Sequence, residues 1–139
     1  MGFDLEVEMI RHAHERDLLT SPYVFDSEQA VAMTQAGADV LVVHLGLTTS
    51  GAVGAQTAIT LDESVELVQE MRDAAVAVRP DVMVLIHGGP VAEPEDAAYV
   101  LSRTSGVVGF FGASSIERLP VERAIREQTE RFKAIEPGA

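Results

Sequence analysis

Two uninterrupted apolar runs, each ending in a histidine with a glycine soon after, constrain the fold of this chain most strongly. They are VLVVH at residues 40–44 and VMVLIH at 82–87, and weaker apolar stretches lie at 18–25 and 107–111. Apolar residues without alternation are typical of strands covered on both faces, as in parallel sheets with helices packed outside. The sequence therefore predicts four parallel strands, at about 18–25, 40–45, 82–87 and 107–112.

Helical patterns separate these strands, so residues 1–139 are expected to form a single α/β domain with the order α-βα-βα-βα-βα. Thr60 and Glu63 have the spacing of a capping box in front of an apolar helical stripe. Right-handed βα connections leave two architectures open, a doubly wound sheet or a segment of a (βα)8 barrel. The helices are predicted over 26–36, 61–78, 94–104 and 120–135, with a short one at about 4–15.

Composition excludes several classes of function. The 139 residues carry 22 acidic and 10 basic side chains, a formal charge of −12, which argues against nucleic acid or an anionic membrane as a partner. A small anionic substrate stays open, because local donors override net charge. The chain has no cysteine, hence no disulfide or thiolate metal site. It shows no secretory h-region and no membrane-length apolar run, so a cytoplasmic protein is expected.

The loops that follow the expected strands are rich in glycine and hydroxyl side chains, whereas the opposite loops are short and plain. In both architectures ligands bind at the carboxyl ends of the strands. Glycines let the backbone approach an anion, and hydroxyls and an arginine add donors, so two of these loops are candidates for an anion cradle. The alternative is that the glycines are ordinary turn residues. The cradle would comprise Gly88, Gly89, Gly112, Ser114, Ser115 and Arg118.

His44 and His87 end two strands in matching positions, and together they are candidates for an acid, a base or substrate donors. Hydrogen-bonded core histidines are the alternative, and a metal pair is less favoured because no third ligand is evident. Thr48 and Thr49 place small hydroxyls on a long loop of the kind that often binds ligands. Glu117 is either a carboxylate at the mouth of the site or half of a surface ion pair with its neighbour in sequence.

Four segments resemble signatures of the phosphoenolpyruvate hydrolase-like family of TIM barrels, which also occurs as the C-terminal barrel of two-domain, virus-resistance-type proteins. They are TSPYVF at 20–25, HLGLTTSG at 44–51, HGGP at 87–90 and GASSIERLP at 112–120. The resemblance implies a small phosphorylated or phosphono-carboxylate ligand held by the 88–89 and 112–115 loops. It places His44 and His87 at the mouth of the barrel, as residues of a hydrolase-like reaction.

The resemblance covers only the C-terminal half of such a barrel, so the fold expected is a (βα)4 half with an extra N-terminal helix. No cofactor is evident in this half, and Mg²⁺ enters only if the missing N-terminal half supplies carboxylates. Unpaired edges and an uncovered inward layer predict a homo-oligomer or a complementing N-terminal half-barrel chain, unless the sequence is a shortened reading of a longer gene. A non-catalytic ligand-binding or interaction module, or a fragment without independent activity, is the alternative to an enzyme. The inward layer is expected to include Val40, Val42, Met83 and Leu85.

Overall fold

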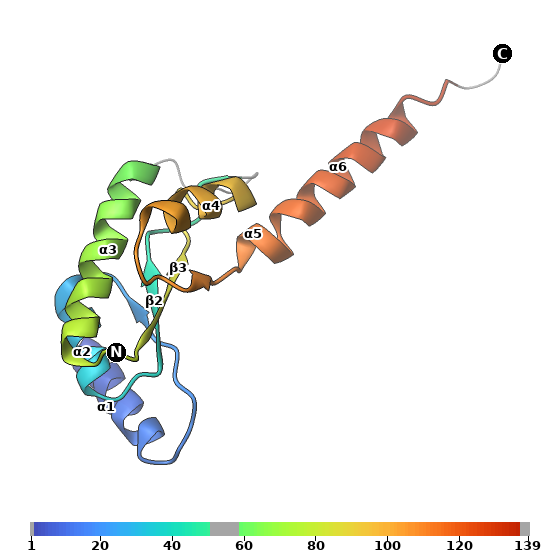
Figure 1. Cartoon of the computed structure of the whole chain (residues 1–139). Coiled ribbons are helices and arrows are strands. Elements are labelled where there is room, and N and C mark those ends of the chain that lie inside the picture. The colour runs from blue at the N-terminus through green and yellow to red at the C-terminus, as the bar shows by residue number, and fades with distance from the viewer. Residues whose placement is uncertain (1, 51–58, 137–139) are drawn as a thin grey trace.

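The computed structural model describes residues 2–50 and 59–136, and alternates helices with parallel strands along the chain (Figure 1). The observed elements follow the predicted order, with one additional short helix after the last strand. They are α1 (Phe3–His14), β1 (Tyr23–Val24), α2 (Ser27–Gln35), β2 (Val40–His44), α3 (Leu61–Val78), β3 (Met83–His87), α4 (Pro94–Arg103), β4 (Gly109–Phe110), α5 (Ser114–Glu117) and α6 (Leu119–Lys133).

The four strands form one parallel sheet in the sequential order β1-β2-β3-β4. Helix α2 packs against α3, and α3 packs against α4, so these helices lie side by side on one face of the sheet (Figure 1). A doubly wound sheet would reverse its strand order and carry helices on both faces. The arrangement is therefore the wall of a barrel, which decides between the two architectures that the sequence left open.

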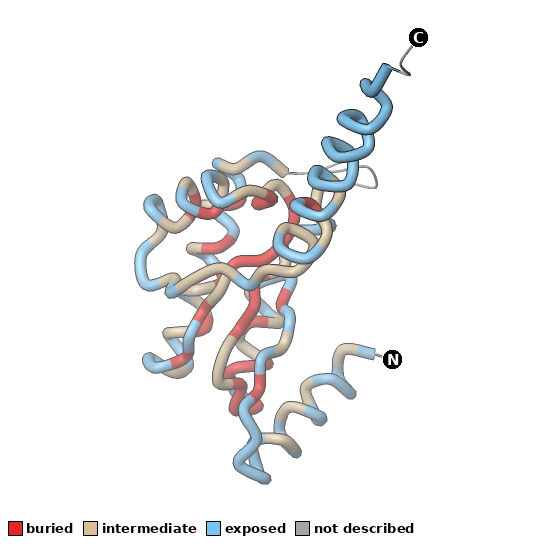
Figure 2. Tube along the Cα trace, turned by 90° about the vertical axis from the view of Figure 1, so that its right-hand side faces the viewer, coloured by how far each residue is buried: buried red, intermediate tan, exposed pale blue. Residues whose placement is uncertain are grey.

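The main core lies between the sheet and this helix layer (Figure 2). Leu41, Val43, Val84 and Ile86 point toward the helices, where they meet a set of apolar helix side chains. Because side chains alternate across a strand, the neighbouring positions face the other side of the sheet. These are Val40, Val42, Met83 and Leu85, which the sequence predicted to be uncovered. Met83 is 45% exposed, Val40 and Leu85 are half-buried, and the prediction is wrong for Val42, which is fully buried in the middle of the sheet.

The predicted helix starts are confirmed by their hydrogen bonds. Asp26 accepts the Gln29 N–H at the start of α2. Thr60 and Glu63 form the reciprocal capping box of α3, and each satisfies a backbone N–H of the other. Local sequence thus sets where these helices begin, and burial of their apolar faces sets how they pack.

The outer strands are shorter than predicted, since β1 and β4 have two residues each. Within residues 2–50 and 59–136, each has a hydrogen-bonded neighbouring strand on one side. Pro22, which lacks an N–H, precedes β1, and Gly109 weakens β4. Short outer strands are expected if β1 and β4 form the two edges of an incomplete barrel.

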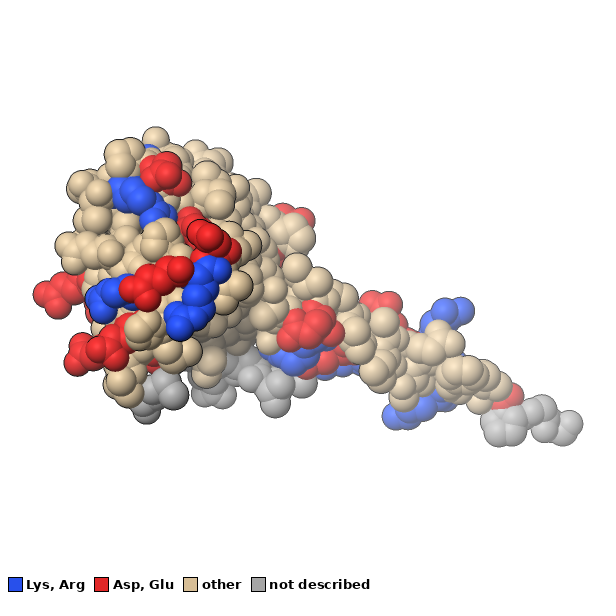
Figure 3. All heavy atoms as spheres, turned by 90° about the horizontal axis from the view of Figure 1, so that it is seen from below, with Lys and Arg blue, Asp and Glu red and all other residues tan. Residues whose placement is uncertain are grey.

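Helix α6 leaves the body of the molecule and extends away from it (Figures 1 and 2). Only its first residue, Leu119, is buried, whereas the large apolar side chains of Val121, Ile125 and Phe132 are more than half exposed. Acidic and basic side chains are interspersed on the body and along α6 in the view from below (Figure 3). An amphipathic helix of this kind has an apolar face without a partner in the described part of the chain.

Candidate functional site

Four aromatic side chains lie level with one another at the carboxyl ends of the strands. His44 of β2 is paired in register with His87 of β3, and their ring centroids are 5.0 Å apart. Phe25 follows β1 and Phe111 follows β4, and their rings lie 5.0 Å from His44 and 5.7 Å from His87 respectively. Tyr23 lies on the same face one level below, in contact with both histidines and with Phe111. We call these five residues the histidine–aromatic cluster.

The Nδ1 atom of each histidine in the cluster forms a hydrogen bond with a backbone group. The Nδ1 of His44 is 3.1 Å from the Gly46 N–H, and the Nδ1 of His87 is 2.7 Å from the Phe111 carbonyl oxygen. Burial, and then the charge of nearby His87, lowers the pKa of His44 from its ordinary value. His87 is only 8% exposed. The two hydrogen bonds hold both rings against the sheet, and burial favours the neutral form of His44.

Two of the glycines predicted to form the anion cradle lie where the loop after β3 contacts the loop after β2. Gly88 and Gly89 have positive φ angles of 71° and 59°, and a Cβ on either would lie within 2.4 Å of a carbonyl oxygen of the loop after β2. The Gly89 N–H donates to the Gly46 carbonyl at 2.7 Å, and the Thr49 N–H donates to the Gly89 carbonyl. The two loops therefore stack backbone on backbone, and the Gly89 amide is already paired.

The remaining candidates lie on the loops after β2 and β4. Arg118 donates to the Ser50 carbonyl at 3.1 Å and pairs with Glu122 at 2.7 Å, so it joins the loop after β2 to α6. Glu117 is exposed on α5, and its neighbour Arg118 forms its ion pair with Glu122 instead. Thr48 and Thr49 are half-buried on the loop after β2, and Gly112, Ser114 and Ser115 are half-buried after β4. Ser115 lines a separate cavity against α4 rather than the one beside His44.

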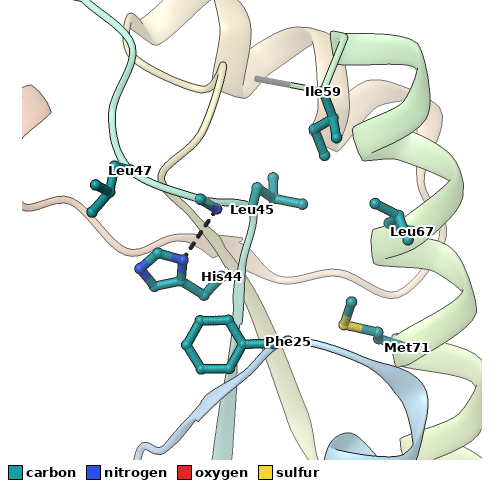
Figure 4. Close-up of a pocket in the computed structure, with 8 residues that line it drawn as sticks. Phe25, His44, Leu45, Leu47, Ile59, Leu67 and Met71 are labelled. Carbon is teal, nitrogen blue, oxygen red and sulfur yellow. Dashed lines mark hydrogen bonds between the residues drawn. The ribbon is translucent and has the colours of Figure 1, made fainter. Parts of the chain in front are cut away.

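A cavity of about 590 Å³ lies beside His44, between the end of β2 and helix α3 (Figure 4). His44 borders it with its ring bonded to Gly46, and Phe25 lies next to His44 on the side of β1 (Figure 4). The other lining side chains are apolar, so His44 is the polar group that would orient a bound molecule. They include Leu45, Leu47, Ile59, Leu67 and Met71.

The described residues contain no group of three or more histidine, aspartate or glutamate side chains that would hold a metal ion. The side chains of this half thus do not fit a magnesium site by themselves, and Mg²⁺ held by carboxylates of a completing half stays a prediction. Within the same described ranges, no helix has the length and apolar character needed to cross a membrane.

Sequence reasoning missed Tyr23, Phe25 and Phe111, because an aromatic residue at the end of an apolar run looks like core. The signal that would have found two of them is positional. Phe25, His44, His87 and Phe111 each end an apolar run, and parallel strands in sequential register bring such ends to one level. That the glycine loops contact a ligand stays a prediction; within the chain, the loops after β2 and β3 contact each other.

The sheet order, the single helix layer and the level strand ends define the class of protein: this chain is half of a TIM barrel. It superposes on a putative phosphonomutase from Burkholderia cenocepacia with a TM-score of 0.58 at 16% identity, over 80% of this chain and 51% of that one. An N-acetylmannosamine-6-phosphate 2-epimerase from Clostridium perfringens gives 0.54 at 18% identity, over 94% and 48%. Both are matched over about half their length.

The chain belongs to the phosphoenolpyruvate hydrolase-like family, whose sequence profile matches residues 1–135. The ToMV resistance protein Tm-1(GCR237) and the ToMV susceptible protein tm-1(GCR26), both of Solanum lycopersicum, are 58% identical over 97% of this chain. The putative transcriptional regulatory protein y4pA of Sinorhizobium fredii is 32% identical over the same share. The chain spans 18% of the tomato proteins and 22% of the bacterial one.

Proposed function

We propose that this chain is the C-terminal half of a TIM-barrel enzyme that acts on phosphoenolpyruvate, phosphonopyruvate or a similar small phosphorylated or phosphono-carboxylate compound. The observation that carries the proposal is the register-matched pair His44 and His87 at the carboxyl edge of the sheet, where barrels bind their ligands. Family membership supports the hydrolase-like chemistry. The cavity beside His44 supports a small ligand.

In this proposal the loop side chains bind the anionic groups and the histidines face the reacting atoms. Thr48, Thr49, Ser114 and Ser115 would donate their hydroxyls. The backbone at Gly88, Gly89 and Gly112 would give close access. Arg118 would add charge, and Glu117 would hold or relay a proton at the mouth.

A non-catalytic binding module is the second candidate, and two contacts favour it. The Gly89 N–H and the Arg118 guanidinium, two of the proposed anion donors, are engaged within the protein. Binding by the remaining hydroxyls would then hold a ligand without the charge stabilisation that hydrolysis needs. A chain that binds without turnover in a completed barrel would establish this candidate.

The first experiment is a thermal-shift titration of the chain with phosphoenolpyruvate, phosphonopyruvate and inorganic phosphate. A ligand that binds only the folded state stabilises it by about 2.7 kcal/mol at one hundred times its Kd, so a rising Tm is expected with the first two compounds. Ser114→Ala combined with Ser115→Ala should weaken the shift, whereas Ser102→Ala, on the exposed surface of α4, should not. An unchanged Tm with all three compounds contradicts the proposal.

We also propose that the partner of this half is a segment with four strands and three helices, on the same or a separate chain. A TIM barrel has one helix for each strand. In this chain the helices α2, α3 and α4 connect the four strands, and two further helices lie at the ends, α1 before β1 and α6 after β4. If a second copy of this chain completed the barrel, the α6 helix of one copy and the α1 helix of the other would compete for the same place at each junction between the two sheets. A segment with four strands and three helices would instead give a barrel with one helix for each strand.

Light scattering of the chain alone and after co-expression with the first half of a family barrel tests this proposal. A one-to-one complex is expected, and it should release phosphate from phosphoenolpyruvate if the half is enzymatic. Phe132→Glu, in the exposed apolar face of α6, should weaken the complex, and Glu130→Gln, on the opposite side of the helix, should not. A stable homodimer that excludes the added half overturns the proposal.

A further inference from the structure

The backbone contacts of the histidine–aromatic cluster fix which nitrogen of each imidazole carries a proton. A backbone N–H is only a donor, so the Gly46 N–H requires a bare lone pair on the Nδ1 of His44. In the neutral ring the proton is then on Nε2. His44 therefore presents a hydrogen-bond donor.

His87 has the opposite arrangement. A carbonyl oxygen is only an acceptor, so the Phe111 carbonyl at 2.7 Å requires a proton on the Nδ1 of His87. Its neutral ring has a bare Nε2, which makes it a hydrogen-bond acceptor and a base. Among the described residues nothing hydrogen-bonds the Nε2 atom of either ring.

Two adjacent imidazoles with opposite tautomers, one of them more than nine-tenths buried, suit a ligand that has an oxygen acceptor next to a proton donor. Among the described residues, the buried side-chain nitrogens without a partner belong to Arg72 and Arg79. The unpaired Nε2 of His87 therefore keeps access to solvent and is open to a ligand at the carboxyl edge of the sheet. Two interchangeable core histidines would have no need of opposite tautomers.

We propose that His87 is the base and His44 the neutral hydrogen-bond donor of the reaction, and that the substrate has a carbonyl or enolate oxygen beside the atom that water attacks. This inference rests on the proposed function and assigns separate roles to its two histidines. A neutral imidazole with a bare Nδ1 stabilises an oxyanion by donating its Nε2–H, and does not release that proton.

With phosphoenolpyruvate as the substrate, the reaction is hydrolysis of the bond between phosphorus and the enol oxygen. The Nε2 of His87 takes a proton from water, whose oxygen forms a bond to phosphorus. The bond from phosphorus to the enol oxygen breaks, and its electron pair stays on that oxygen, where the His44 Nε2–H stabilises it. The proton on His87 then passes to the enolate carbon, which leaves pyruvate and phosphate.

The test is the tautomeric state of each histidine in the isolated chain, measured by long-range correlation of imidazole protons and nitrogens. We expect a protonated Nε2 and a bare Nδ1 for His44, and the reverse for His87. Variants that each lack one histidine assign the signals, and the exposed His12 is the internal reference. Two rings with the same tautomer, or a protonated Nε2 on neutral His87, overturn the inference.

Addition of phosphonopyruvate to the same sample separates this inference from the proposed function. A rise in Tm together with a shift of the His87 Nε2 signal supports both. A rise in Tm that leaves both Nε2 signals unchanged leaves the proposed function standing and overturns the roles of the histidines. Opposite tautomers without any rise in Tm overturn the proposed function and with it the roles in this reaction, and confirm the tautomers alone.

Discussion

Gly46, Gly88 and Gly89 show how much of the site depends on backbone positions that have no side chain. All three have positive φ angles, but they differ in their surroundings. A Cβ at Gly88 would lie 2.3 Å from the Gly46 carbonyl oxygen, whereas the nearest atom to a Cβ at Gly46 is 3.9 Å away. The first position thus combines backbone strain with a collision, and the second has strain only.

This difference predicts separate effects for two alanine substitutions. Gly46→Ala should lower the free energy of unfolding by about 1 kcal/mol from strain alone. Gly88→Ala should cost roughly 1–3 kcal/mol more, because the stacked loops must move apart. Urea denaturation of both variants measures the difference, and equal losses would show that the loops do not stack in solution.

The lowered pKa of His44 predicts a loss of stability in weak acid. The unfolded chain protonates this ring near pH 6.5, whereas the folded chain resists protonation because of burial and His87. As the pH falls from about 6.5 toward the lower folded pKa, the unfolded state binds more protons, so the free energy of unfolding decreases. His44→Asn should flatten this region of the pH profile, and His12→Asn on exposed α1 should leave it unchanged; an identical slope in wild type and His44→Asn contradicts the prediction.

At the scale of elements, the starts of β1 and β2 are tied together by one carboxylate. Asp39 accepts the Thr20 N–H at 2.8 Å and the Thr20 hydroxyl at 3.0 Å, and the Asp39 N–H donates to that hydroxyl. The bond from the Thr20 backbone is the main reason that the pKa of Asp39 is lowered. The clamp holds an edge strand that has only two ladder residues.

Asp39→Ala should therefore destabilise the chain by about 1–3 kcal/mol at neutral pH, since it leaves the buried Thr20 groups without their acceptor. Because the folded carboxylate has the lower pKa, this stabilisation should disappear as the pH falls below about 3.8, through the folded value. Denaturation at neutral and acidic pH measures both effects. Asp81→Ala, which removes an exposed ion pair with Arg79, is the control and should cost little.

The elements themselves were largely predictable from the sequence. Thr60 with Glu63 fixed the start of α3, and the apolar runs fixed β2 and β3, because capping and hydrophobic pattern are local signals. The lengths of β1 and β4 were not predictable, since the length of a strand depends on pairing with its neighbours in the sheet, which is not a local signal. The contacts of Gly88 and Arg118 within the chain were not predictable for a similar reason, because each residue meets the loop after β2, which is distant from it in the sequence.

At the scale of the whole molecule, the sheet face opposite the helices is partly open. Met83 is 45% exposed, Tyr23 40% and Phe111 39%, whereas Val42 at the centre of this face is buried. Inward-facing residues of a complete barrel are packed against those of the other strands. A half barrel therefore displays apolar surface that a complete one would bury.

Met83→Glu should thus reduce the fluorescence of an apolar dye bound to the chain and lower its tendency to aggregate. Val78→Glu, at a similarly exposed position on helix α3, is the matched control and should leave dye binding to the open face unchanged. Dye titration of the two variants at equal folded fraction gives the comparison. An equal effect of both substitutions would mean that the open face is not where the dye binds.

The hydrogen bond from His87 to the Phe111 carbonyl has a consequence for insertions and deletions. The segment that connects the two strands crosses the outside of the sheet, where an added or lost residue is absorbed by a surface loop at small cost. If that change slipped β4 along β3 by one position, a different main-chain group would face His87, and the ring would adopt the other tautomer with every side chain intact. Among related chains, insertions and deletions between His87 and Phe111 should therefore be confined to the surface loops on either side of α4, and the register of β4 on β3 should stay the same.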